Sequence, residues 1–231
     1  MQVMLLAAGR GTRLGELGRQ TPKVLVEIGG KPLLARQFEY LARQGADRVV
    51  VNAHHLAEQI LDFVGNTPAP FPVDVVVERE LLGTAGGLRN ALPYFRPDEP
   101  VIVLNGDTLL DAPLCRLLKA HLRTGASATI GATRLEDTTG KGVIEVDGAM
   151  RVTGFEEKPV QPRPGLANAG LYAIERELAT LIPRDVFFDF AHDLFPLALD
   201  IEADLRVHEL GGEFADIGTP ESLAAVQAAV A

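Results

Sequence analysis

Short apolar runs and amphipathic stretches alternate along roughly the first 125 residues of the chain. The apolar runs are rich in Val, Ile and Leu, and they read VMLLAA, DRVVVN, VDVVVE and PVIVLN in order. Between them, apolar residues recur at helical spacing, for example between Pro32 and Gly45. Strands that alternate with helices pair in parallel, because each helix carries the chain back across the sheet. The pattern predicts an α/β fold with a mostly parallel central sheet between layers of helices.

The pattern changes after about Ser127, where shorter strands and turns replace the alternation. These strands read ATIGATR, GVIEVDG, RVTGFEE and LANAGLYAI, and Asp147-Gly148 is a typical hairpin turn. The proline-rich stretch PVQPRPG is interpreted as a loop over the site and not as a domain boundary. We therefore predict a small antiparallel elaboration within one domain.

The composition is that of an acidic globular protein, with 47% hydrophobic residues, 23% charged residues and a formal net charge of -9. Such a balance repels polyanions, so we expect no nucleic-acid partner. No apolar run approaches the roughly 18 residues of a membrane-spanning helix, and the N-terminus lacks the cationic start of a secretion signal. We expect no membrane contact and a cytoplasmic location. The single Cys115 lies in an apolar stretch and is expected to be a buried, inert thiol.

One loop departs from this acidic background. It follows the first apolar run and carries Arg10, Arg13, Arg19 and Lys23 against only Glu16, a net charge of +3. Glycines within it allow the backbone to approach a ligand, and arginine side chains match phosphate oxygens in two-pronged contacts. The spacing fits neither the dinucleotide fingerprint nor the P-loop. The loop therefore predicts that an oligophosphate binds here in a loop geometry that differs from both of these motifs.

Two aspartates follow apolar runs and are candidate Mg²⁺ ligands. Asp107 ends the run VIVLNGD, and Asp216 lies in EFADIG. Mg²⁺ usually takes one or two protein carboxylates and leaves its other positions to water and substrate phosphates. Lys158 in FEEKP is a candidate phosphate ligand. Asn168 lies in the apolar strand LANAGLY, and a buried asparagine needs hydrogen-bond partners. A ligand hydroxyl and a backbone group are both candidates for that partner.

Seven segments together resemble the sugar-1-phosphate nucleotidylyltransferase family, the nucleotide-sugar pyrophosphorylases. In chain order between about residues 3 and 221 they are AAGRGTRL, TPK, LLGTAGG, NGDT, FEEKP, NAGLY and DIGTPE. The resemblance implies a Rossmann-like three-layer α/β/α sandwich and one nucleotidyltransferase domain over residues 1–231. It places the nucleotide-binding part at about 1–110 and the sugar-binding part at about 111–231.

The resemblance also implies roles by position. The catalytic residues would be Arg13, Lys23, Asp107 and Lys158, and Mg²⁺ would be held by Asp107 and Asp216. The nucleoside triphosphate would contact Ala8, Gly9, Gly11, Thr12, Arg13, Lys23, Gly83, Thr84, Gly86 and Gly87. The sugar 1-phosphate would contact Asn105, Glu157, Lys158 and Asn168. The implied reaction transfers a nucleotidyl group to the sugar 1-phosphate and releases pyrophosphate, in a monomer or a homodimer.

Several alternatives stay open at this point. The motifs resemble guanylyltransferases for mannose or heptose 1-phosphate, although Leu81 and Val24 stand where relatives often have proline, and Glu16 has no evident role. Uridylyl or thymidylyl transfer is the alternative within the family. A non-catalytic nucleotide-sugar-binding subunit and a metal-dependent glycosyltransferase are rivals of another class. The latter normally has an Asp-x-Asp pair, where this chain has Asn105-Gly106-Asp107.

Overall fold

A computed structural model describes residues 1–211 and 214–230 of the chain. The strands are β1 (Gln2–Leu6), β2 (Glu27–Ile28), β3 (Lys31–Pro32), β4 (Arg48–Ala53), β5 (Val73–Val77), β6 (Val101–Asn105), β7 (Thr108–Leu110), β8 (Ala128–Leu135), β9 (Gly142–Val146), β10 (Val152–Glu157), β11 (Gly165–Ile174), β12 (Leu205–Glu209) and β13 (Phe214–Asp216). The α-helices are α1 (Glu16–Gln20), α2 (Leu33–Arg43), α3 (Ala57–Asn66), α4 (Gly83–Ala91), α5 (Leu114–Thr124), α6 (Arg176–Thr180), α7 (Phe195–Asp200) and α8 (Pro220–Val230). A 3-10 turn, η1 (Thr12–Leu14), precedes α1, and a π-helical segment, η4 (Phe190–Leu194), precedes α7.

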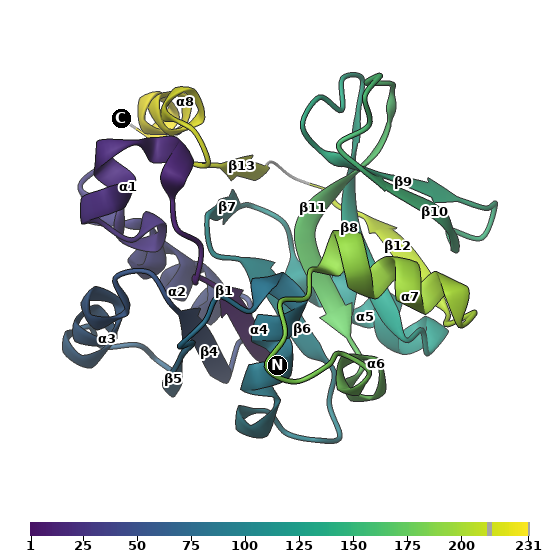
Figure 1. The fold of residues 1–231 in the computed structure, drawn as a ribbon, viewed down its shortest axis with the longest axis horizontal. Helices are drawn as coiled ribbons and strands as arrows, with labels where there is room; N and C mark the ends of the chain where they lie inside the picture. The colour runs from purple at the N-terminus through teal and green to yellow at the C-terminus, as the bar shows by residue number, and fades with distance from the viewer. Residues whose placement is uncertain (212–213, 231) are drawn as a thin grey trace.

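A large sheet runs through the molecule in the order β10-β9-β11-β6-β1-β4-β5, with β8 beside β11 and β12 beside β8 (Figure 1). The strands β6, β1, β4 and β5 are parallel, which confirms the α/β prediction. Their register pairs Leu6 with both Asn52 and Asn105. The carboxyl ends of three parallel strands therefore meet at one edge of the sheet, where open α/β sheets bind ligands.

The antiparallel elaboration continues the same sheet. The strand β11 pairs antiparallel with β6, β8 and β9, and β9 and β10 form a hairpin. The backbone N–H of Asp147 donates to the carbonyl of Arg151 at 2.9 Å, so the predicted turn at Asp147-Gly148 is confirmed. The β9–β10 hairpin extends from the sheet at one end of the molecule (Figure 1).

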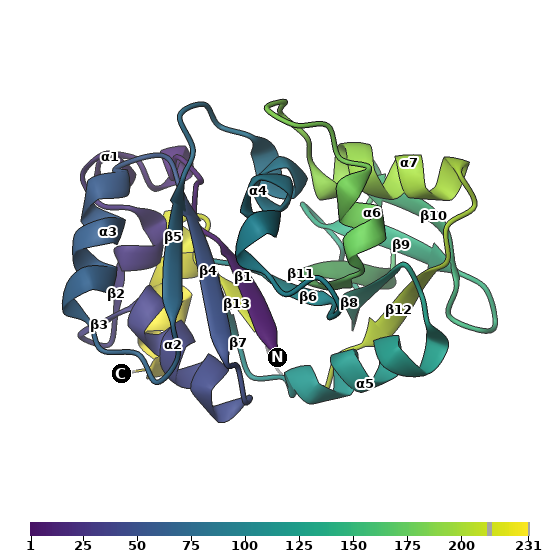
Figure 2. The same ribbon diagram turned by 90° about the horizontal axis from the view of Figure 1, so that it is seen from below.

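Alternate residues of the central strands enter cores on opposite faces of the sheet. Val3 and Leu5 of β1 pack in the core under α2, α3 and α5, whereas Met4 packs in the core under α4, α6 and α7 (Figure 2). Successive side chains of a strand point to opposite faces, so a strand covered on both sides is apolar throughout. This explains why the sequence VMLL reads as a continuous apolar run.

A third, smaller core joins the start of the chain to its last helix. Leu14 of η1 and Ile217 are both buried in it, together with apolar residues of α8. The short strands β7 and β13 pair antiparallel beside this core and set Thr108 opposite Asp216. Burial of Leu14 next to Ile217 thus brings the basic loop and the last strand to the same side of the central sheet.

One prediction about the core is wrong. Cys115 lies on α5 with its side chain exposed, and its neighbours Leu114 and Leu117 provide the buried face of that helix. An apolar sequence context did not distinguish the two faces of the helix. Across the described ranges, no helix combines the length and apolar character needed to span a bilayer.

Candidate active site

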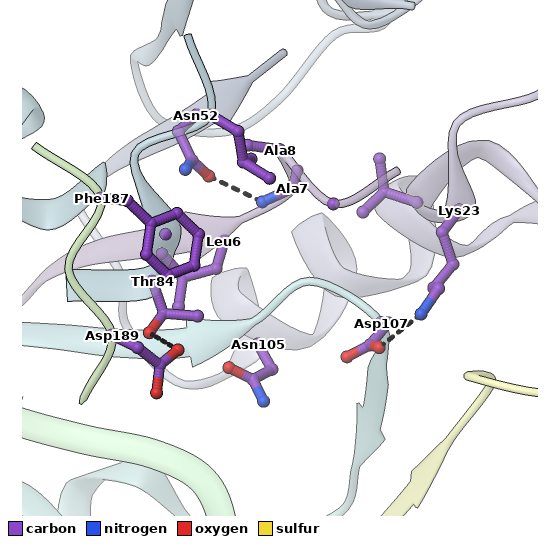
Figure 3. A pocket seen from close by; sticks show the side chains of 14 residues that line it. Leu6, Ala7, Ala8, Lys23, Asn52, Thr84, Asn105, Asp107, Phe187 and Asp189 are labelled. Carbon is purple, nitrogen blue, oxygen red and sulfur yellow. Dashed lines mark hydrogen bonds and ion pairs between the residues drawn. The ribbon is translucent and has the colours of Figure 1, made fainter. Parts of the chain in front are cut away.

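Two adjoining cavities open at the carboxyl ends of β1, β4 and β6. The first, which we call the apolar cavity, is shown in Figure 3. It is lined by Leu6, Ala7, Ala8, Gly9, Lys23, Val24, Asn52, Leu81, Gly83, Thr84, Asn105, Asp107, Phe187 and Asp189. Its walls come from the end of β1, the start of α4 and the segment before η4. An aromatic side chain, Phe187, is 59% exposed at this cavity.

The second, which we call the polar cavity, shares Asn105 and Asp107 with the first. Its other lining residues are Arg13, Thr108, Gly140, Lys141, Gly142, Glu157, Lys158, Asn168, Ala169, Gly170 and Asp216. These come from η1, β7, the β8–β9 connection, the end of β10, β11 and β13. The structure therefore brings Arg13, Lys158 and Asp216 to one cavity, although they are far apart in the sequence.

Asp107 lies at the junction of the two cavities and is paired with Lys23. The Lys23 Nζ lies 2.9 Å from Asp107 Oδ2, and both side chains are largely buried (Figure 3). The turn that carries Asp107 is held from below by buried Gln37, whose Nε2 donates to the carbonyls of Gly106 at 2.9 Å and Thr108 at 3.2 Å. A Cβ at Gly106 would lie 2.5 Å from the Leu6 carbonyl oxygen. Glycine is therefore required there, and it lets the turn lie against the end of β1.

Asp216 is held in the polar cavity by Lys141. The Lys141 Nζ donates to Asp216 Oδ2 at 2.7 Å, and the Gly218 N–H donates to Asp216 Oδ1 at 3.0 Å. Burial alone would raise the pKa of Asp216, but the hydrogen bond and charge of Lys141 outweigh it. The charge of Arg13 acts in the same direction, so the pKa lies below its ordinary value of 3.8. Asp216 is therefore a carboxylate at neutral pH.

The basic loop after β1 is folded tightly. Gly11 has a φ of 62° and lies against Gly18, where any side chain would overlap the Gly11 carbonyl. The His55 Nε2 lies 2.9 Å from the Gly18 carbonyl oxygen and ties the loop to the segment before α3. Gly9 lines the apolar cavity and Arg13 lines the polar cavity. Gly11 and Thr12 form the turn of the chain between these two residues.

Glu16, whose role the sequence left open, begins α1. Its carboxylate lies 3.3 Å from Arg19 Nη1 and accepts a hydrogen bond from Gln20 at 2.7 Å. A carboxylate in the first turn of a helix is favourable because the helix dipole is positive there. The side chain is exposed, so Glu16 stabilises the short helix and adds little to the charge within the cavities.

At the glycine-rich start of α4, some residues line the apolar cavity and others pack against the rest of the protein. Gly83 and Thr84 line the apolar cavity, and the Thr84 hydroxyl donates to Asp189 Oδ2 at 2.8 Å (Figure 3). Gly86 and Gly87 are buried behind them in α4. A Cβ at Gly87 would lie 2.5 Å from Asn52 Nδ2. Gly86 and Gly87 therefore permit close packing of α4, and the structure places them outside the cavity lining.

Asn52 and Glu78 connect α4 to the loop after β1. The Asn52 Oδ1 accepts from the Ala7 N–H at 2.7 Å, and its Nδ2 donates to Glu78 Oε1 at 2.6 Å. Glu78 Oε2 accepts from the Leu82 N–H at 3.0 Å. Burial raises the pKa of Glu78, and the two hydrogen bonds oppose part of that rise. This buried chain of hydrogen bonds fixes Ala7 at the point where β1 enters the site.

The sugar-side candidates lie together in the polar cavity. Lys158 has a φ of 50° and its Nζ lies 3.2 Å from Glu157 Oε1. The Asn168 Oδ1 accepts from the Gly170 N–H at 3.0 Å, and its Nδ2 donates to the Tyr172 hydroxyl at 2.9 Å. One amide hydrogen of Asn168 has no hydrogen-bond partner within the described ranges, so it can donate to a ligand.

The residues of the site that were not singled out in the sequence include Gln37, Asn52, Lys141 and Phe187. Asn52 carried a signal, because it lies near the end of a buried strand, as Asn105 does. Lys141 lies between two strands beside Gly140 and Gly142, where a glycine-flanked lysine resembles a surface turn. Gln37 has the sequence context of an ordinary polar helix position, and Phe187 lies in a loop. No local pattern marks these last two.

The two aspartates fit the chemistry of a magnesium site. Both carry hard oxygen donors, and Thr108 next to Asp107 is directly opposite Asp216 in the β7–β13 pair. Within residues 1–211 and 214–230, no group of three or more acidic, histidine or cysteine side chains is placed to hold a metal ion. Mg²⁺ needs no more than one or two carboxylates when phosphates supply the other ligands, and two aspartates meet that number.

The chain belongs to the nucleotidyl transferase family, whose model matches residues 2–231. This confirms the family resemblance drawn from the motifs. A mannose-1-phosphate guanyltransferase of Debaryomyces hansenii is 33% identical over 226 residues, which cover 96% of this chain and 62% of that protein. A UTP–glucose-1-phosphate uridylyltransferase of Synechocystis is 33% identical over 235 residues, which cover 94% of this chain and 60% of that protein. The chain therefore spans about three fifths of the length of these relatives.

Among solved structures, HddC from Yersinia pseudotuberculosis is similar along its whole length. The TM-score is 0.87 at 30% sequence identity, and the match covers 99% of this chain and 98% of that chain. HddC complexed with GMP-PN gives a TM-score of 0.86. The Rossmann-like architecture is thereby confirmed.

Proposed function

We propose that this protein transfers a nucleotidyl group from a nucleoside triphosphate to a sugar 1-phosphate, giving a nucleoside-diphosphate sugar and pyrophosphate. The observation that carries the proposal is the meeting of an apolar and a polar cavity at Asn105 and Asp107. The reaction must bind a flat base and a sugar, two groups of different polarity, so that the phosphates attached to them meet at one point. Two cavities with a charged junction supply that geometry.

In the proposed reaction, an oxygen of the sugar 1-phosphate attacks the α-phosphorus of the triphosphate in line. A new oxygen–phosphorus bond forms while the bond from the α-phosphorus to the bridging oxygen breaks, and pyrophosphate leaves with the electron pair. The protein needs no covalent nucleophile for this. It must hold the reactants in position, which contributes about 7–11 kcal/mol in well-oriented systems, and stabilise the developing charge.

The side chains divide these tasks by location. The apolar cavity receives the base, with Ala8, Gly83 and the ring of Phe187 as contact surfaces. Arg13 and Lys23 neutralise the triphosphate from the basic loop, and Lys158 binds the phosphate of the sugar from the opposite wall. Glu157 and Asn168 accept and donate hydrogen bonds to sugar hydroxyls. Asp107 and Asp216 would hold Mg²⁺, which would offset phosphate charge when bound.

We further propose GTP and a mannose- or heptose-type sugar 1-phosphate as the substrates. The support is the name of the Debaryomyces relative and the GMP-PN in the HddC complex. The Synechocystis relative is equally identical and is named for UTP, so uridylyl transfer is the second candidate. The cytoplasmic location, the monomeric or dimeric state and the absence of nucleic-acid partners stay predictions from the sequence.

The test is release of pyrophosphate. The protein is incubated with GTP, UTP, ATP or dTTP, each against mannose, glucose, N-acetylglucosamine and heptose 1-phosphates, with Mg²⁺ or with chelator. We expect release with GTP and mannose or heptose 1-phosphate, and loss of release with chelator. Release with UTP alone would correct the base, and no release with any combination would refute the catalytic proposal in favour of a binding subunit.

A further inference from the structure

A cluster of three arginines lies outside the site described above. Arg89 from the second half of α4, Arg176 at the start of α6 and Arg184 from the following loop line one cavity of about 170 Å³. A water molecule occupies about 30 Å³ of liquid, so the cavity has room for about five or six groups of that size. We call these three residues the arginine cluster. The helices α4 and α6 that carry two of them pack side by side (Figure 2).

No carboxylate neutralises the arginine cluster among the residues that the structure describes. None of the three forms an ion pair there, and Asp185, which lines the same cavity, lies beyond ion-pair distance from each of them. The cavity lining therefore has a net charge of +2 in a chain whose net charge is -9. By contrast, Lys23, Lys141 and Lys158 in the candidate active site are each paired with a carboxylate.

Two of the guanidinium groups are fixed by backbone carbonyls. The Arg89 Nε donates to the Ile182 carbonyl at 3.0 Å, and the Arg176 Nη1 donates to the Leu92 carbonyl at 3.2 Å. Each guanidinium has five N–H donors, so most remain available to a ligand. Burial lowers the pKa of Arg89, and the like charges of Arg184 and Arg176 lower it further. The three cations thus repel one another, which an anion between them would relieve.

We propose that the arginine cluster is a binding site for a compact phosphate-bearing anion, separate from the candidate active site. Arginine is suited to this ligand because its planar fork matches two phosphate oxygens at once. Three such groups around a small cavity fit a phosphoryl or diphosphoryl group, with Asn90 as a further polar side chain in the lining.

The same loop connects the arginine cluster to the apolar cavity. Arg184 lies in the loop after α6, and Phe187 and Asp189, a few residues later, line the apolar cavity. Between them, the Phe188 N–H donates to the Leu82 carbonyl at 2.8 Å, and the Phe188 carbonyl accepts from the N–H of Ala85 and Gly86. The loop is therefore bonded to the start of α4, while Arg89 near the other end of α4 bonds to Ile182. From this connection we infer that occupancy of the arginine cluster changes the KM for the nucleoside triphosphate.

The binding test uses calorimetric titration with inorganic phosphate and, in a second arm, with inorganic diphosphate. The proteins compared are the wild type, the double variant Arg176→Gln/Arg184→Gln, and the matched control Arg43→Gln/Arg134→Gln. The control removes two exposed arginines, one at the end of α2 and one on β8, that line neither the arginine cluster nor the candidate active site, so its net charge equals that of the double variant. Phosphate also reaches the candidate active site in all three proteins, so the difference between them reports the arginine cluster.

We expect the double variant to lose one class of phosphate sites or to bind it at least about tenfold more weakly, since a charge-assisted hydrogen bond is lost with each arginine. The control should match the wild type. Phosphate should also raise the Tm of the wild type and the control more than that of the double variant. Equal binding by all three proteins, or an equal loss in the control, would refute the site.

The coupling is tested separately, in the pyrophosphate-release assay at fixed sugar 1-phosphate. Arg176→Gln/Arg184→Gln should turn over normally without added phosphate, but phosphate should no longer shift its KM for the triphosphate as it does in the wild type. The same shift in both proteins would show that phosphate acts only by competition at the active site. That result would refute the coupling. Because the titration needs no turnover, it can succeed or fail independently of the proposed reaction.

Discussion

Replacing Asn52 by leucine tests whether the buried hydrogen bonds behind the apolar cavity hold its shape. Asn52 is 1% exposed, and its amide bonds at the same time to the Ala7 N–H and to Glu78 Oε1, at 2.7 and 2.6 Å. Leucine has the same branched arrangement of four side-chain heavy atoms but neither donates nor accepts. The substitution therefore leaves the Ala7 N–H without a partner and removes one of the two donors to the Glu78 carboxylate.

The magnitude follows from these two broken hydrogen bonds. A buried polar group left without its partner costs about 1–3 kcal/mol, so the two together cost about 2–6 kcal/mol, and the added apolar burial of leucine recovers part of this. We expect a net loss of about 1–5 kcal/mol in the free energy of unfolding. For a chain of this size about 2–4 °C of Tm corresponds to each kcal/mol, which gives a decrease of about 2–20 °C.

The assay is thermal unfolding by circular dichroism, with Asn66→Leu as the matched control. Asn66 ends α3 in an exposed position and bonds only to the Asp62 carbonyl at 2.8 Å, so the same chemical change there should cost no more than about 0.5 kcal/mol. In the pyrophosphate-release assay, Asn52→Leu should also raise the KM for the triphosphate, because Ala7 begins the basic loop. A Tm within about 1 °C of the wild type would refute the assigned hydrogen bonds, since a loss below the predicted range means they contribute nothing net.

Three further predictions concern the site directly. Asp107→Asn keeps the size of the side chain but removes a charge at the cavity junction, so kcat for pyrophosphate release should fall about 10²–10³-fold. The control Asp111→Asn changes an exposed aspartate and should leave kcat at the wild-type value. A fall of less than about threefold in Asp107→Asn would show that Asp107 is not a metal ligand. Phe187→Ala should raise the KM for the triphosphate about tenfold, because stacking on a base contributes about 1–3 kcal/mol, and an unchanged KM would exclude contact between this ring and the base. The pKa of Asp216 is lowered, so its carboxylate stabilises the fold above the ordinary pKa of 3.8, and this contribution disappears as the pH falls through the lower pKa of the folded state. The Tm difference between wild type and Asp216→Asn should therefore be constant above about pH 5 and shrink below pH 3.8. A difference that stays the same down to about pH 2.5 would show that the charged carboxylate of Asp216 does not stabilise the folded state.

The layered fold was predictable because its signal is local. Strands such as β1 are apolar at every position, since Val3 and Leu5 face one core and Met4 the other. The helix α2 shows its buried face as a helical spacing of apolar residues. Cys115 shows the limit of the same reasoning, because a residue in an apolar stretch can still lie on the exposed face of an amphipathic helix.

The composition of the site was predictable only through the family motifs. Nothing in the spacing of Arg13 and Asp216 indicates that they share a cavity, because about 200 residues separate them. Their meeting depends on the small core in which Leu14 packs with Ile217, and on the pairing of β7 with β13. Such contacts are set by tertiary packing and leave no periodic signal in either segment.

The pairing of charges shows why the electrostatics of the site could not be deduced from the sequence. Each carboxylate of the polar cavity lies next to a lysine, at 2.9 Å for Lys23 and Asp107, 2.7 Å for Lys141 and Asp216, and 3.2 Å for Lys158 and Glu157. Only the last pair is adjacent in the chain, and the other two join residues 84 and 75 positions apart.

The net charge of the folded site also differs from the charge of the basic loop alone. The residues of the loop sum to an excess of positive charge, which by itself predicts a cationic site for phosphate. In the folded protein the lysines instead offset the repulsion between neighbouring carboxylates, so the site is close to neutral before any substrate enters. A substrate phosphate must therefore compete with Asp107 for Lys23, and a divalent cation must compete with Lys23 for Asp107. When both ligands bind, each takes one partner of this ion pair, so neither side chain is left without an opposite charge. Binding of the phosphate and of the cation therefore favour each other.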